Sequence, residues 1–166
     1  MKNIPKKLEM VANFAIICVA ILIAATLYQR YRAEKTGPPQ IATGASVPLS
    51  GVDWKSHSKT LVFGLSTQCH FCTESAPFYR QLVEKLGDKN DVYLLAVLPQ
   101  PSVESRDHLV RLGVRIEDVR QESLNSIPIN STPTLLIVDQ RGIVVNEWVG
   151  KLTPAQESAV LAAVGL

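Results

Sequence analysis

The sequence predicts an α/β domain built on a mixed sheet that is flanked by helices. Two apolar runs of strand length, residues 60–65 and 92–98, are each followed by a segment with helical character. This alternation favours parallel pairing of the two strands. Two further apolar runs, residues 134–138 and 143–149, flank the short polar turn 139–142, which predicts an antiparallel hairpin and therefore a mixed sheet.

The segment after the first strand is predicted to be a single amphipathic helix. Its apolar residues recur at intervals of three and four, which places them on one face, and Gly87 offers a stop. The recurring residues are Cys72, Ala76, Tyr79, Val83 and Leu86. A second helix is expected between Pro101 and Gly113.

The last part of the chain contains one clear helix start and one charged connection. Thr153, Pro154 and Gln156 form a capping sequence, and the helix that they open is expected to continue to about Val164. Three of its residues are available for packing: Ala155, Ala159 and Val160. The stretch 115–122 mixes both charge signs and is expected to be a solvated, irregular connection.

Composition limits the chain to one modest domain and an additional segment. It has 166 residues, of which 46% are hydrophobic and 19% are charged, with a formal net charge of +2. Residues 37–166 carry 11 basic and 13 acidic residues, a net charge of −2, without a basic cluster. Nucleic-acid binding leaves such a cluster as its footprint, so we exclude nucleic acid as a partner.

The amino-terminal segment predicts a membrane anchor. Residues 10–28 are almost wholly apolar, and at about 1.5 Å per residue a helix of this length nearly spans a hydrocarbon core of about 30 Å. A cleaved signal peptide is the alternative, but residues 24–26 make a poor cleavage site. Lys and Arg are equally frequent on the two sides, so only the α-amine favours an amino terminus inside the cell. We therefore expect a single-pass protein whose domain lies outside the cytoplasm, on the periplasmic side.

These features divide the chain into four parts. Residues 1–9 form a short basic segment, residues 10–28 the transmembrane anchor, and residues 29–47 a juxtamembrane tether rich in Gly, Pro, Ser and Thr. The remaining residues, 48–166, have the size of one small domain. Every candidate catalytic residue lies there.

The most informative motif is the C-x-x-C pair of Cys69 and Cys72, directly after a strand and at the start of a helix. A structural zinc site needs four ligands, and no second pair exists, because the third cysteine, Cys18, lies in the apolar amino-terminal run. We assign no metal, and redox chemistry is the leading interpretation. One alternative is a membrane-tethered chaperone that holds a soft metal such as copper with the two cysteines and His70. Another is a redox-inert domain with a structural bridge.

Several separate features resemble the thioredoxin family over residues 47–166. They are Cys69-His70-Phe71-Cys72, Pro77 in the following helix, Thr132-Pro133-Thr134 before the penultimate strand, and Val149-Gly150 before the last helix. With its amino-terminal anchor and a Thr before the proline, the chain looks like the membrane-tethered TlpA-like branch. The resemblance implies a thioredoxin-like fold after one transmembrane helix. It also implies thiol-disulfide exchange with client proteins, a membrane redox partner and no cofactor.

The resemblance further implies the roles of the two cysteines, which form a redox-active disulfide in the family. Cys69 stands at the start of the helix, where the helix dipole and unpaired N–H groups favour a thiolate, so it is the expected nucleophile. Cys72 lies one turn deeper on the apolar face and is the expected resolving thiol. Whether the pair reduces or oxidises its clients is left open.

Four further residues are expected to tune the redox pair or to bind clients. His70 either stabilises the Cys69 thiolate or projects into solvent. Phe71 offers a hydrophobic surface to a client, although local packing explains it equally well. In the family, the proline that matches Pro133 follows a cis peptide bond, and Thr132 would then offer its backbone to an extended client strand.

The sequence departs from thioredoxin at the position of its buried acid. Phe63, six residues before Cys69, stands where thioredoxin keeps an acid that helps to deprotonate the resolving thiol. Glu74 is the candidate proton acceptor in its place, directly or through water. The alternative is that Glu74 is an exposed acid that complements the first helical turn.

Overall fold

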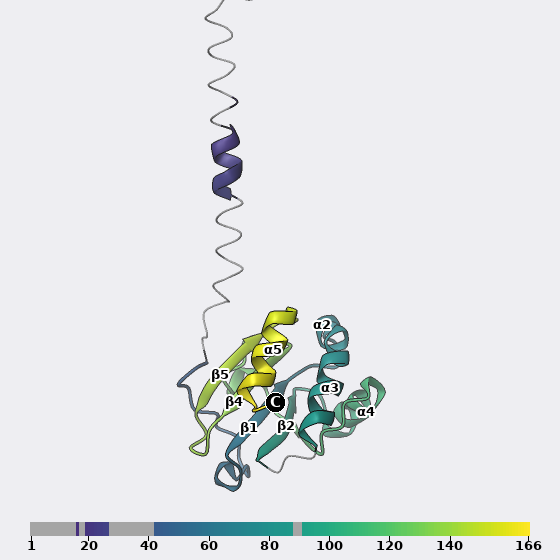
Figure 1. Ribbon diagram of the computed structural model, residues 1–166. Coiled ribbons are helices and arrows are strands. Elements are labelled where there is room, and N and C mark those ends of the chain that lie inside the picture. Colours follow the sequence, from purple (N-terminus) through teal and green to yellow (C-terminus); the bar gives the residue numbers. More distant parts are fainter. Residues whose placement is uncertain (1–15, 17–18, 27–41, 88–90) are drawn as a thin grey trace, which may run out of the picture. The chain divides into compact units, whose positions relative to one another are not determined.

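The computed structural model describes residues 16, 19–26, 42–87 and 91–166, and the chain forms two compact units that divide between Pro39 and Gln40 (Figure 1). In the first unit, residues 19–26 are helical. Within the described residues, no helix has both the length and the apolar character that crossing a bilayer requires. Most of the predicted anchor, residues 10–28, lies outside the described residues.

The second unit is built on a five-stranded mixed sheet in the order β3-β2-β1-β4-β5 (Figure 1). The strands are β1 (Lys59–Gly64), β2 (Val92–Leu98), β3 (Asp118–Gln121), β4 (Thr134–Val138) and β5 (Val144–Val149). β2 is parallel to both β1 and β3, whereas β4 is antiparallel to both β1 and β5. The predictions of a mixed sheet, a parallel first pair and a carboxy-terminal hairpin are confirmed.

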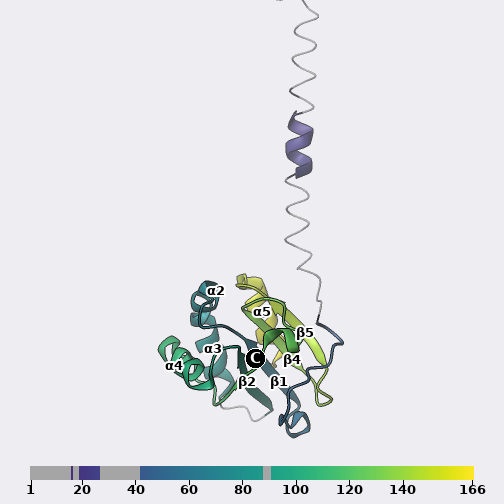
Figure 2. The same cartoon turned by 180° about the vertical axis from the view of Figure 1, so that it is seen from behind.

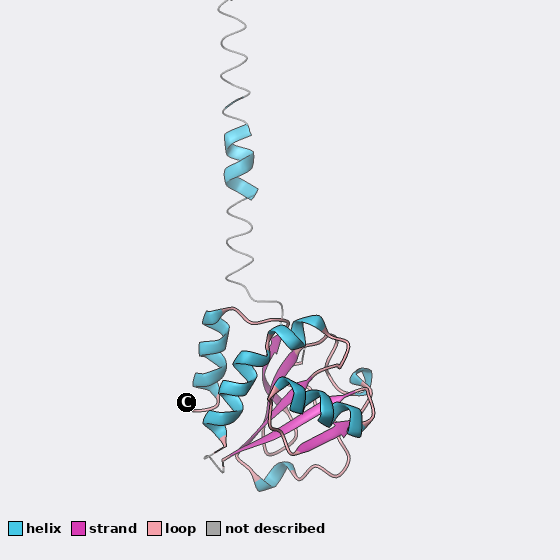
Figure 3. Cartoon of the chain, turned by 90° about the vertical axis from the view of Figure 1, so that its right-hand side faces the viewer, coloured by secondary structure: helices cyan, strands magenta, loops and turns pink. Residues whose placement is uncertain are grey.

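Helices flank this sheet (Figure 3). They are α2 (His70–Glu74), α3 (Ala76–Leu86), α4 (Ser102–Leu112) and α5 (Pro154–Ala163), together with the 3-10 turns η1 (Trp54–Ser56) and η2 (Leu124–Ser126). Gly113 ends α4 with a φ of +70°, a left-handed conformation that glycine adopts without a steric cost. The predicted capping box is present, because the Thr153 and Gln156 side chains each accept from the other's backbone N–H.

The strands separate two apolar cores because successive side chains point to opposite faces. On β1, Leu61 and Phe63 join the core that α3 and α5 cover. Val62 joins the second core, which the chain before β1 and the segment after η2 cover (Figure 2). β1 is buried from Thr60 to Gly64, as expected for a central strand with neighbours on both sides.

The predicted single helix after β1 is in fact two helices. Ser75 separates α2 from α3, although its N–H still donates to the Phe71 carbonyl at 3.0 Å and its carbonyl accepts from Tyr79 at 3.1 Å. The interruption has a simple cause, because Pro77 has no N–H to donate to the Thr73 carbonyl. The predicted apolar face is nevertheless the buried one.

Two other expectations were wrong in part. The stretch 115–122 contains the edge strand β3, in which Val119 is 4% exposed and pairs with Ala96 of β2. Ala42 and Val47, in the segment before residue 48, are also buried. In α5, only Val160 of the three residues named for packing is buried, and the two alanines are exposed.

Gly64 ends β1 in a space that does not accommodate a side chain. A Cβ there would lie 2.5 Å from Cδ1 of the buried Ile129 and 3.4 Å from the Thr134 carbonyl oxygen. We expect Gly64→Ala to lower the free energy of unfolding by about 1–3 kcal/mol, measured by urea denaturation, because the core must shift to admit the methyl group. Gly87→Ala is the control, since φ is −58° and no neighbour lies closer than 3.5 Å. A similar loss in both variants would contradict this explanation.

Candidate active site

The C-x-x-C motif lies at the carboxyl end of the central strand. Gly64 pairs with Val97 of β2 on one side and with Thr134 of β4 on the other. The chain then leaves the sheet and turns into α2, whose N-cap is Cys69. Because β4 begins at this edge, the Thr132-Pro133 segment just before it lies at the same end of the sheet as the cysteines.

Cys69 and Cys72 form a disulfide, with their Cα atoms 5.2 Å apart. The two sulfurs differ in environment, because Cys72 is 1% exposed and belongs to the main core, whereas Cys69 is only partly buried. The Cys69 Sγ also caps α2, since it accepts the backbone N–H of Cys72 at 3.1 Å. Cys69 is therefore the more accessible sulfur, and it already lies where helical N–H groups stabilise negative charge.

The Thr132–Pro133 peptide bond is cis, as the resemblance to thioredoxin implied. Pro133 is buried, and its carbonyl accepts from the Gly150 N–H at 2.7 Å, which ties this segment to the turn after β5. Thr132 is partly exposed, and within residues 42–87 and 91–166 its backbone has no hydrogen-bond partner. Its backbone N–H and carbonyl are thus available to an extended peptide.

A clamp that the sequence did not reveal holds the loop before Cys69. The Gln100 side chain accepts from the Thr67 N–H at 3.2 Å and donates to the Ser66 Oγ at 3.0 Å. The Thr67 hydroxyl also donates to Glu104 of α4 at 2.9 Å. The predicted parallel pairing could have placed Gln100 near Ser66 and Thr67, because the residues that follow two parallel strands emerge at the same edge of the sheet.

Both carboxylate oxygens of Glu74, the candidate proton acceptor, contact basic side chains. Its Oε2 accepts from Lys151 Nζ at 2.7 Å, and its Oε1 lies 2.9 Å from His70 Nε2. The hydrogen bond from Lys151 is the main cause of a lowered pKa for the Glu74 carboxyl, which makes it a weaker base. Lys151 is a second member of the site that sequence reasoning missed, although it follows directly on the Val149-Gly150 motif.

His70 and Phe71 lie on the outer side of α2. The His70 side chain is 78% exposed and is directed to Glu74, while Phe71 is 54% exposed with its ring centroid 5.8 Å from that of His70. An exposed phenylalanine beside a disulfide is an apolar contact surface. His70 is thus exposed and contacts Glu74.

Phe63 fills the position of the missing acid. It is 0% exposed and meets the Tyr79 ring edge to face, with centroids 5.4 Å apart at 88°. Burial raises the pKa of Tyr79 to about 12, so the phenol stays protonated under physiological conditions. Phe63 itself offers no group that could accept a proton.

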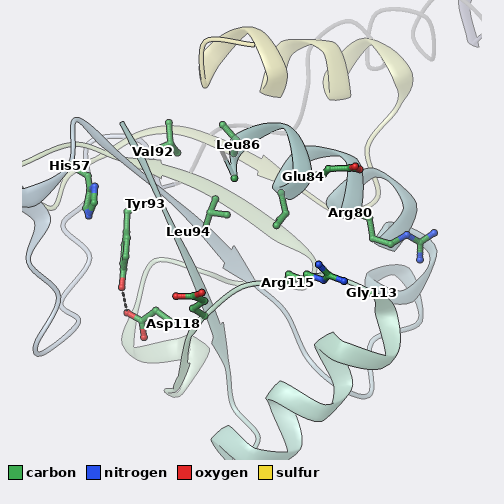
Figure 4. A pocket seen from close by; sticks show the side chains of 13 residues that line it. His57, Arg80, Glu84, Leu86, Val92, Tyr93, Leu94, Gly113, Arg115 and Asp118 are labelled. Atoms are coloured by element: carbon green, nitrogen blue, oxygen red, sulfur yellow. Dashed lines mark hydrogen bonds between the residues drawn. The ribbon is translucent and has the colours of Figure 1, made fainter. Parts of the chain in front are cut away.

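A groove of about 770 Å³ lies elsewhere, between α3, the start of β2 and the loop before β3 (Figure 4). None of its lining residues belongs to the C-x-x-C motif or to the cis-proline segment. Its polar groups are partly paired: Tyr93 donates to Asp118 at 2.9 Å, and the His57 ring stacks on Tyr93 at 4.8 Å (Figure 4). Within the described residues, no group of three or more His, Cys, Asp or Glu is arranged to hold a metal ion.

The described domain shares its architecture with solved thiol-disulfide exchange proteins. A thiol:disulfide interchange protein from Bacteroides sp. superposes with a TM-score of 0.58 at 19% identity, covering 76% of this chain and 92% of that one. The fold is thioredoxin-like. The thioredoxin domain of a thiol-disulfide oxidoreductase from Bacteroides vulgatus has a TM-score of 0.55 at 18% identity, covering 74% of this chain and 97% of that one.

A thiol:disulfide interchange protein of the thioredoxin family from Chlorobium tepidum TLS also has a TM-score of 0.55 at 18% identity. The aligned region covers 78% of this chain and 100% of the Chlorobium protein. No protein-family model matches the sequence, and no curated protein matches it either. The similarity to these thioredoxin-like structures therefore establishes the fold and not the activity.

The bond from Lys151 should control the acidity of Glu74. We expect Lys151→Met to raise the pKa of Glu74 toward its ordinary value, measured by NMR titration, because the main cause of the lowered pKa is removed. In the wild type, the stability that this carboxylate provides is present above its unfolded-state pKa. It is lost as the pH falls through the lower folded-state pKa. Lys85→Met removes the same charge from an exposed site on α3 and should leave Glu74 unchanged; equal effects would refute the assignment.

Proposed function

We propose that this protein is a membrane-anchored thiol-disulfide oxidoreductase that exchanges disulfides with client proteins. The observation that carries the proposal is the asymmetric disulfide, with Cys69 partly exposed at a helix N-cap and Cys72 buried beneath it. The cis Thr132–Pro133 segment lies at the same edge of the sheet. The solved proteins of the same fold that are named for disulfide interchange support this choice.

The exchange follows from the unequal positions of the two sulfurs. In the reducing direction, the Cys69 thiolate attacks a client disulfide, one client sulfur leaves as a thiolate, and a mixed disulfide forms. Cys72 then loses its proton and attacks the Cys69 sulfur, which closes the Cys69–Cys72 disulfide and releases the second client thiolate. The client gains two electrons, the protein loses two, and the reverse sequence oxidises a client dithiol.

The surface around the disulfide supports a protein client. The free backbone of Thr132 can pair with an extended segment of the client, as an added strand does at a sheet edge. Phe71, exposed on α2, adds an apolar contact. His70 and Glu74 pair with each other, so in this proposal they shape the rim of the site and do not accept the proton.

The anchor and its orientation complete the proposal. Residues 10–28 have the length and apolar composition of a membrane-spanning helix, and a domain outside the cytoplasm would meet clients in a compartment where disulfides form. The cis-proline segment and the C-x-x-C motif would then face the same compartment as a redox partner in the membrane.

Mixed-disulfide trapping tests the mechanism. In the full chain with Cys18→Ser, we expect Cys72→Ser to accumulate adducts through Cys69, because the thiol that resolves them is gone. Non-reducing electrophoresis followed by mass spectrometry of a disulfide-containing model client such as scrambled ribonuclease would measure them. Cys69→Ser in the same background is the matched control and should trap nothing. Equal trapping by the two variants, or none by either, would contradict the roles of Cys69 as nucleophile and Cys72 as resolving thiol.

Labelling of membrane vesicles tests the orientation. We expect Gln81→Cys, an exposed position on α3, to react with an impermeant maleimide in right-side-out vesicles of a chain whose three native cysteines are replaced by serine. In inverted vesicles, the same site should react only after detergent is added. The opposite pattern would place the domain in the cytoplasm, and recovery of the chain in the soluble fraction would contradict the anchor.

A further inference from the structure

The chemistry of Cys72 poses a question that the expected residues do not answer. The resolving thiol must lose a proton inside an apolar core, and burial favours the neutral thiol. Phe63 offers no proton acceptor, and both oxygens of Glu74 are engaged with Lys151 and His70. Polar groups on the buried side of α2 and α3 are therefore candidates for stabilising the Cys72 thiolate.

Two buried hydroxyl groups lie on that side. Ser75 is 6% exposed and Tyr79 is 1% exposed, and among the described residues neither the Ser75 Oγ nor the Tyr79 Oη has a hydrogen-bond partner. Buried polar atoms without partners are rare and costly, so each one calls for an explanation, and a role in redox chemistry is one such explanation.

Both hydroxyls are placed on the helical face of Cys72. Ser75 follows it by three residues and Tyr79 by seven, spacings that keep side chains on one face of a helix. Ser75 separates α2 from α3, but two helical hydrogen bonds span the break: the Ser75 N–H donates to the Phe71 carbonyl and the Tyr79 N–H donates to the Ser75 carbonyl. Ser75 and Tyr79 are themselves four residues apart, the spacing of neighbours on one helical face, and the Ser75 side chain partly offsets the effect of burial that raises the pKa of Tyr79.

We propose that the Ser75 hydroxyl donates a hydrogen bond to the Cys72 sulfur when the disulfide is open, and that Tyr79 is the positioning residue that donates in turn to Ser75. This inference rests on the proposed function and deepens it. In the disulfide, Cys72 carries no negative charge, and the hydroxyls have no partner. In the mixed disulfide, the Cys72 proton leaves to solvent, the Ser75 O–H donates to the thiolate, and the thiolate attacks Cys69.

The arrangement has a thermodynamic consequence with a definite sign. A hydrogen bond that forms only in the open state stabilises that state relative to the disulfide, so the two hydroxyls make the pair easier to reduce. The same bond favours the Cys72 thiolate and speeds the resolving step. It does not act on Cys69, whose sulfur already accepts from the backbone of α2.

Two measurements on the full chain with Cys18→Ser test the proposal. With Ser75→Ala, we expect the equilibrium with glutathione to shift about tenfold toward the Cys69–Cys72 disulfide. This shift corresponds to a reduction potential that is about 30 mV more negative. When the reduced protein reacts with dithionitrobenzoate, Cys69 releases the first nitrothiobenzoate and Cys72 the second. Ser75→Ala should slow the second release about tenfold, the effect of one charge-assisted hydrogen bond, and leave the first unchanged.

Matched variants separate chemistry from packing. Ser75→Thr keeps a hydroxyl, so its glutathione equilibrium and its second release rate should stay within about twofold of the wild type. Tyr79→Phe keeps the ring against Phe63 and should shift the equilibrium and the rate in the same direction as Ser75→Ala, by about threefold. Unchanged potential and second-phase rate in Ser75→Ala would overturn the proposal, as would equal slowing by Ser75→Thr. Neither measurement uses a client, so a failure of client trapping would overturn the proposed function alone.

Discussion

The burial of β1 between a parallel and an antiparallel neighbour is the constraint on which the rest of the site depends. Hydrogen bonding on both sides fixes the end of this strand at Gly64, between Val97 and Thr134. The segments that carry the cysteines and the cis-proline must therefore leave the sheet at the same edge. The clamp from Gln100 to Ser66 and Thr67 extends this restraint to the residue pair just before the motif.

The environment of the disulfide changes sharply from its outer to its inner side. Outside, the Lys151–Glu74–His70 contacts form a charged rim that stays solvated, and Phe71 adds an exposed apolar group. Inside, Cys72 is enclosed by a core whose polar atoms are few. A thiolate is therefore easy to form at Cys69 and costly to form at Cys72, and the order of the two attacks follows from this difference in solvation.

Sequence patterns predicted most of the secondary structure because apolar periodicity reports burial directly. They failed where burial depends on a distant partner. Val119 is apolar among charged residues, and only its pairing with β2 makes its neighbours a strand. Ala42 is buried in the second core, and its N–H donates to the buried Glu147, which lies 105 residues away in the sequence. The interruption of the helix at Ser75 could have been predicted from the sequence, since Pro77 lacks the N–H that a helix needs in any context.

The sequence by itself indicated a mixed sheet with a parallel first pair and a carboxy-terminal hairpin, the two sulfurs at a helix start and the lack of an acid at Phe63, while the cis-proline segment followed from the resemblance to thioredoxin. Such features are carried by local periodicity, by capping residues and by the identity of single side chains. Only the tertiary structure decided that Glu74 is engaged by Lys151, 77 residues later, and that the Ser75 and Tyr79 hydroxyls are buried without partners. The reason is physical: hydrogen bonding and desolvation depend on which groups the fold brings within a few ångströms, and sequence spacing does not encode that distance across separate elements.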